Sequence, residues 1–123
     1  MATVYTSAGE AAVVDLIDGA SSTHLDNTNA HVGWGTGAGT ADKADTTLFT
    51  EASETRVTAV ASQPAADKNQ WVATLTADGA KTITNAGLFN AVSGGTLVVK
   101  GDFTGIVLAL GDKIELTFSL EQT

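Results

Sequence analysis

The sequence predicts an all-β protein with one short N-terminal helix, in which antiparallel strands form a β-sandwich or barrel. Two observations predict this fold. Several short segments alternate apolar and polar residues, as strands with one buried and one solvated face do. Glycine-containing turns separate these segments, which is typical of sandwiches and barrels. The 123 residues fit one domain, 1–123, in which 1–30 form a helix or arm and 31–123 form the sandwich.

The helix is expected at Ala8–Ile17, where apolar residues recur at helical spacing. Ser7 is a suitable N-cap, and Glu10 follows three residues later, which is the spacing of a capping box. Gly19 is a natural C-terminal stop. Such a helix either covers the sheet or docks on a partner, and the residues leave both options open.

The clearest strand patterns lie in the second half of the chain. They are Thr55–Ser62, Gln70–Thr76, Lys81–Asn90, Thr96–Phe103 and Lys113–Leu120. Turns are expected at Pro64–Lys68, Asp78–Gly79, Ser93–Gly95 and Gly111–Asp112. The apolar run Ile106–Leu110 is either a strand end or a packed crossover. In the last pattern one face is wholly apolar, which indicates a sheet with one buried face.

Four glycines alternate over His31–Gly39. Glycine at every second position leaves one face of a strand without side chains, so an aromatic ring or another backbone is expected to approach it closely. The candidate structural or interface residues here are Gly33, Trp34, Gly35 and Gly37. The spacing matches neither a dinucleotide-binding fingerprint nor a P-loop.

Three larger side chains are further candidates. Trp34 and Trp71 either pack in the core or serve as an interface anchor or a carbohydrate-stacking platform. Arg56, the only arginine, follows Glu51 and Glu54 closely. It is expected to form an ion pair or loop brace within the chain, or a pair between subunits.

No pattern of side chains predicts catalysis. The acidic residues Asp42, Asp45, Glu51 and Glu54 lie in polar sequence, where solvation keeps carboxylates ionised, so an acid–base pair or a calcium site is the less favoured interpretation. The two histidines lack zinc spacing, and no serine stands in a Gly-x-Ser-x-Gly motif. We expect no enzymatic activity, no cofactor, no metal and no small-molecule substrate.

Composition argues against other classes of partner. The 14 acidic and 6 basic residues give a net charge of −8, and the basic residues are scattered singly, so nucleic-acid binding is not expected. No apolar run approaches the roughly 18 residues of a membrane span, and the first residues lack a signal-peptide pattern. The absence of cysteine excludes disulfides and thiolate chemistry.

Several of these motifs together resemble a group of short bacteriophage structural proteins. The resemblance runs through Gly33–Gly37, Asp45–Leu48, Glu51, Arg56, Asn85–Ala91, Ser93–Leu97, Phe103 and Gly111–Phe118. It covers about residues 31–120 and rests on the order and spacing of these pieces. Members of the group are described as capsid decoration (cement) proteins or as tail-associated proteins.

The resemblance implies a jelly-roll-like sandwich that assembles as a homotrimer on the capsid exterior of a virion. Its partner would be the major capsid protein, with Trp34 or the glycine strand near the threefold contacts. The alternative is a tail-fibre or baseplate module that binds a receptor or carbohydrate through an exposed Trp34 or Trp71.

Overall fold

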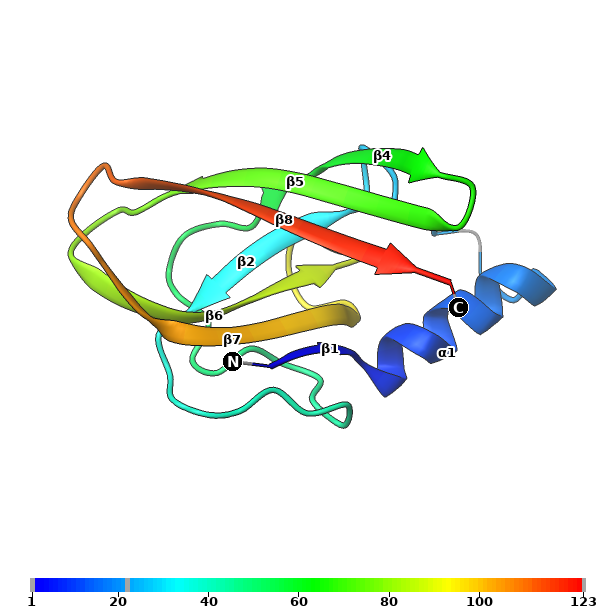
Figure 1. The fold of residues 1–123 in the computed structure, drawn as a ribbon, viewed down its shortest axis with the longest axis horizontal. Coiled ribbons are helices and arrows are strands. Elements are labelled where there is room, and N and C mark those ends of the chain that lie inside the picture. The colour runs from blue at the N-terminus through cyan, green and yellow to red at the C-terminus, as the bar shows by residue number, and fades with distance from the viewer. Residues whose placement is uncertain (1, 22, 123) are drawn as a thin grey trace.

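The computed structural model describes residues 2–21 and 23–122, which form two facing antiparallel sheets and one helix (Figure 1). In chain order the elements are β1 (Thr3–Tyr5), α1 (Ser7–Asp18), β2 (His31–Gly35), β3 (Val57–Thr58), β4 (Val60–Ala65), β5 (Lys68–Thr76), β6 (Lys81–Phe89), β7 (Leu97–Leu108) and β8 (Lys113–Glu121). The larger sheet has the order β1-β7-β6-β2-β3, and the smaller has the order β4-β5-β8. The predicted all-β sandwich with one short helix is confirmed, whereas jelly-roll connectivity stays a prediction.

The first thirty residues contribute a strand as well as the helix. β1 pairs antiparallel with β7, so that Thr3 lies opposite Gly101 and Tyr5 opposite Val99. The carboxylate of Asp102 also accepts a hydrogen bond from the backbone N–H of Ala2 at 3.1 Å. The sandwich therefore begins before residue 31. A three-residue strand is too short to show alternation, which is why the sequence did not reveal it.

The helix is capped by Thr6 and not by Ser7 as predicted. The Thr6 backbone is extended, and its hydroxyl oxygen accepts a hydrogen bond from the N–H of Gly9 at 2.9 Å. Thr6 is fully buried and also donates to a carbonyl of β7, so tertiary contact selects the cap. Glu10 lies one position too far along for a capping box and pairs with Lys43 at 2.6 Å. Gly19 ends the helix with φ of 80°, as predicted.

α1 contacts the sandwich mainly at β7 and extends beyond the end of the sheets (Figure 1). Gly9 is its only buried residue. A β-carbon there would lie 2.7 Å from the carbonyl oxygen of Val98, so this close approach to β7 requires glycine. Val13 and Leu16 line an open groove of ≈ 300 Å³ beside β5 and β8, whereas Ile17 is 81% exposed. The helix is thus only partly a lid. Within the described residues, no helix is long and apolar enough to cross a membrane.

The predicted strand Thr55–Ser62 is divided between the two sheets. β3 pairs with β2 in the larger sheet, and β4 pairs with β5 in the smaller one. The chain crosses at Ala59, which is 1% exposed and donates its N–H to Ala30 at 2.8 Å. A small side chain allows the backbone to pass through the core at this point. Alternation continues across the break, so the sequence pattern could not show it.

Two further boundaries differ from the predicted ones. Pro64, expected in a turn, lies in β4, which is an edge strand with an irregular register where a missing N–H is tolerated. β7 continues past Phe103 to Leu108, so the run beginning at Ile106 is a strand end and not a crossover. β8 follows its predicted alternation, with Phe118 buried and Leu116 half-buried on the inner face.

Candidate functional site

The outer face of the larger sheet is covered by the chain segment 36–56, which we call the covering loop (Figure 1). Beneath it Leu48, Phe89 and Leu97 form an apolar cluster separate from the main core. Each of the three is at most 5% exposed. The part of the larger sheet that lies beneath this loop is therefore buried on both faces, whereas the end of β7 is exposed. Most of the candidate residues from the sequence lie at the join between this sheet and the covering loop.

The alternating glycines form the seat of the covering loop. A β-carbon at Gly35 would lie 2.4 Å from the carbonyl oxygen of Phe49, and one at Gly37 would lie 2.8 Å from its carbonyl carbon. At Gly39 the ring of Phe49 would be 2.7 Å away. The predicted close approach of a backbone or an aromatic ring is confirmed, and Phe49 supplies both. β2 itself ends at Gly35, so Gly37 and Gly39 lie in the covering loop.

Asn85 fixes the backbone of Phe49 over this seat. Its side-chain oxygen accepts a hydrogen bond from the Phe49 N–H at 3.0 Å, and its amide nitrogen donates to the Phe49 carbonyl at 3.1 Å. The side chain thus bonds to both polar groups of one residue. Asn85 is fully buried in β6. Sequence reasoning missed it, although an amide within a β-rich apolar segment is a signal of a buried hydrogen-bonding role.

Arg56 is a brace within the chain. It donates to both carboxylate oxygens of Glu51 at 2.7 and 2.9 Å and to the carbonyls of Ala91 and Gly94 at 3.0 and 2.8 Å. Its guanidinium carbon lies 3.4 Å from the ring centroid of Phe89. The predicted intrachain ion pair is confirmed. Because the Arg56 side chain is 7% exposed, little of it is left for a neighbouring subunit.

Lys100 ties the covering loop from the opposite side. It is fully buried, and its ammonium group donates to Asp45 at 2.9 Å and to the Thr47 carbonyl at 2.8 Å. The ring centroid of Phe49 lies 3.3 Å from the same nitrogen. The hydrogen bond from Lys100 lowers the pKa of Asp45. The two charged residues are 55 positions apart, so nothing in their spacing indicates the contact.

Trp34 is anchored by a buried carboxylate. Its indole N–H donates to Glu54 at 2.9 Å, and the other oxygen of Glu54 accepts from the Asp78 N–H at 3.0 Å and contacts Lys81. Burial raises the pKa of Glu54, but the hydrogen bonds from Lys81, Trp34 and Asp78 outweigh it and lower the pKa to about 2. The carboxylate is therefore kept ionised. It joins β2 to the turn before β6.

Neither tryptophan is available on the surface. Trp34 is 1% exposed and Trp71 is 4% exposed, and the Trp71 indole N–H donates to the Leu25 carbonyl at 2.9 Å. Both side chains belong to the main core between the sheets. Both tryptophans therefore pack in the core, which is the first of the two interpretations of these residues. Neither forms a platform on which a sugar could stack.

The acidic residues of the covering loop have structural partners. Asp45 binds Lys100 and accepts the N–H of Asp42 at 3.0 Å, while Asp42 accepts the N–H of Ala44 at 2.8 Å. Across residues 2–21 and 23–122, no three histidine, aspartate or glutamate side chains gather as a metal site. Every buried side-chain nitrogen or oxygen in the described part of the chain has a hydrogen-bond partner.

Two open regions of the described surface lie at β7 and β8. The first is the apolar end of β7 with the following turn, where Ile106, Val107 and Leu110 are 40%, 80% and 74% exposed. We call these three residues the apolar tip. Ile106 and Val107 are successive residues of β7, so the tip exposes apolar side chains on both faces of the strand end.

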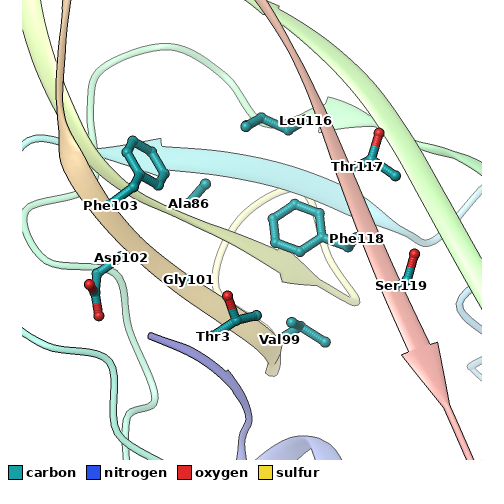
Figure 2. A pocket seen from close by; sticks show the side chains of 10 residues that line it. All are labelled: Thr3, Ala86, Val99, Gly101, Asp102, Phe103, Leu116, Thr117, Phe118 and Ser119. Atoms are coloured by element: carbon teal, nitrogen blue, oxygen red, sulfur yellow. The ribbon is translucent and has the colours of Figure 1, made fainter. Parts of the chain in front are cut away.

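The second open region is a groove of ≈ 170 Å³ beside β8. Val99 and Phe103 of β7 line one side of it, and Leu116 and Phe118 of β8 line the other. Figure 2 shows the Phe118 ring directed toward the larger sheet, with Thr117 on the opposite side of β8. The groove opens between the two sheets because the smaller sheet has fewer strands than the larger one.

Comparison with protein-family models, with curated proteins and with solved structures finds no match to this chain.

We predict that Gly35→Ala destabilises the protein by about 1–3 kcal/mol or more, because the added carbon meets a backbone oxygen that Asn85 holds in place. Thermal unfolding measures the change. Gly79→Ala is the matched control, since nothing lies within 4 Å of the added carbon, and its effect should stay within about 0.5 kcal/mol. Equal destabilisation by both changes would contradict the role of the glycine seat.

Arg56→Lys should cost roughly 2 kcal/mol or more, because an ammonium group cannot reproduce the two-point contact with Glu51 and also reach the two carbonyls. Chemical denaturation measures the loss. Lys43→Ala removes a pair whose side chains are 57% and 45% exposed and should cost no more than about 1 kcal/mol. An Arg56→Lys variant as stable as the native protein would show that the brace is dispensable.

The pKa of Glu54 predicts how stability depends on pH. Its folded-state pKa of about 2 lies below the ordinary value of 4.5, so its stabilisation is present above pH 4.5 and is lost as the pH falls toward 2. The contribution is at most about 3–4 kcal/mol, since one pKa unit corresponds to about 1.4 kcal/mol. Glu54→Gln should be less stable at pH 7 and lose less stability on acidification. Parallel stability–pH curves for the two proteins would contradict this assignment.

Proposed function

We propose that this chain is a bacteriophage structural protein that decorates the outer surface of the capsid and links neighbouring capsid subunits. The observation that carries the proposal is where the phage-like motif residues lie. Gly33, Leu48, Glu51 and Arg56 all lie at the join between the larger sheet and the covering loop. Residues at this join determine the fold, so their resemblance to phage structural proteins supports a common scaffold with an assembly role.

The surface chemistry is consistent with such a role. The chain carries a net charge of −8, and the apolar tip is one of the exposed apolar regions on this acidic surface, as are Val14 and Ile17 of α1. Complete burial of one such side chain contributes roughly 1.5–3 kcal/mol, so the three partly exposed residues of the tip could contribute a few kcal/mol per copy. We assign the apolar tip to the contact with the major capsid protein.

The mechanism is mechanical. Each copy bridges adjacent capsid subunits, and every bridge must break before the shell bursts. Arg56 and Lys100 hold the covering loop rigidly on the sheet, so the protein resists deformation under load. The expected trimer would bind at three sites together, and linked binding raises the overall affinity without stronger individual contacts.

The alternative role as a receptor- or carbohydrate-binding module of a tail fibre or baseplate has less support. It needs an exposed aromatic platform, whereas Trp34 and Trp71 are both buried. We therefore favour capsid decoration over the tail role.

Electron microscopy of virions made with and without this coding sequence tests the proposal. We expect a difference density on the outer capsid surface, together with faster genome loss on heating when the protein is missing. Density confined to the tail would instead support the alternative, and identical particles would contradict both roles.

A rebinding experiment tests the assignment of the apolar tip. Purified protein should bind to capsids that lack it, and Val107→Asp should reduce the binding at least about tenfold, since losing 1.4 kcal/mol of contact energy has this effect. Val60→Asp is the control, because Val60 is 66% exposed on β4, away from the tip. Both variants should keep the native melting temperature. Equal binding by Val107→Asp and the native protein would exclude the tip as the contact.

A further inference from the structure

β8 is an open edge of the smaller sheet. It pairs with β5 on one side, through nine consecutive residue pairs without a register shift, and it is the last strand in the order β4-β5-β8. Natural edge strands are usually short or interrupted by proline or bulges, because a straight edge is a template for another strand. β8 is nine residues long and contains no proline. It is therefore well formed to accept a further strand.

The sequence of β8 is complementary to itself. Consider a second copy of β8 that runs antiparallel beside the first, with Thr117 opposite Thr117 of the second copy. Lys113 then lies opposite Glu121 of the second copy, and the symmetry repeats this pair at the other end. These residues lie on the exposed face of the strand, where opposite charges on facing strands stabilise pairing.

The inner face fits the same register. Leu116 lies opposite Phe118 of the second copy, and Ile114 lies opposite Leu120 of the second copy. The apolar face of the smaller sheet thus continues across the contact. The second strand would extend over the side of the ≈ 170 Å³ groove where Phe103 is only half-buried; Figure 2 shows Phe103 and Phe118 on this side. Pairing therefore buries apolar surface as well as satisfying the backbone of the edge.

Other registers are less favourable. Centring the pair on Glu115 would place this carboxylate opposite its own copy, and centring it on Phe118 would place Glu115 opposite Glu121 of the second copy. Like charges directly opposite one another destabilise a strand pair. Centring on Leu116 brings no charged pair together. Among these registers, the one centred on Thr117 alone combines opposite charges with a continuous apolar face.

We propose that a second copy of this chain binds along β8 by antiparallel pairing centred on Thr117. The contact has twofold symmetry, and it joins the two three-stranded sheets into one continuous sheet. On a particle it would connect copies that lie side by side. It uses neither the apolar tip nor the capsid, so its failure would leave the proposed decoration role standing.

A cysteine placed at the centre of the contact tests this register. The chain has no cysteine, so any disulfide in a variant must join the introduced thiols. In Thr117→Cys the two introduced thiols face each other. The Cα atoms that carry them lie within the range of roughly 4.4–6.8 Å that a disulfide requires. Under mild oxidation we expect a covalent dimer on a non-reducing gel.

Ser119→Cys is the matched control, because Ser119 lies on the same exposed face two residues away. In the proposed register its two copies are four positions apart along the strands, or about 13 Å, so cross-linking should be at least about tenfold slower than for Thr117→Cys.

The double variant Glu115→Cys with Ser119→Cys brings facing thiols together again and should form the dimer. Equal rates for the two single variants would overturn the proposal. So would the absence of a dimer from both Thr117→Cys and the double variant when their circular dichroism is native.

Charge reversal gives a second test in the Thr117→Cys background. Lys113→Glu places like charges at both ends of the contact and should slow cross-linking severalfold. Adding Glu121→Lys restores opposite charges and should restore the rate. Within each copy Glu121 lies opposite Lys68, so the melting temperature of the reversed variant must be checked. A folded variant in which reversal does not restore cross-linking would overturn this register.

Discussion

The structure depends on the contact between the backbone of Phe49 and the bare outer face of β2. Gly35 leaves room for the Phe49 carbonyl, and Asn85 bonds to both polar groups of that residue. Without this contact the loop over residues 36–56 would lose its position against β2, and Leu48 would be drawn away from the cluster that buries it. A side chain at Gly35 would exclude the backbone of Phe49. The covering loop can therefore form a third layer over the larger sheet only because this face of β2 carries no side chains.

Two buried cations complete this layer from opposite sides. Burying a charge is costly unless it is paired and hydrogen-bonded. Arg56 and Lys100 each meet this condition with a carboxylate, at least one backbone carbonyl and an aromatic ring. Each cation therefore fixes loop backbone that no regular secondary structure holds. A chain with only 6 basic residues thus uses two of them to hold its own backbone.

Local patterns predicted the parts of the fold that depend on local sequence. The alternation of β8, the stop at Gly19 and the close approach over the glycines are all visible in the residues. The helix cap at Thr6, the crossing at Ala59 and the Lys100–Asp45 pair are not, because each depends on a partner distant in the chain. The same difference applies to the candidate site. Arg56 and Glu51 are near neighbours and were identified, whereas Asn85 reaches the covering loop only through the packing of β6.

The pairing of β1 with β7 has a consequence for the synthesis of the protein. Thr3 is the first described residue of the sheet, and its partner Gly101 is made 98 residues later. During translation the N-terminal strand thus has no partner until β7 has left the ribosome, and contacts between distant residues form slowly. Until then the edge of this strand is unpaired, and unpaired strand edges favour aggregation.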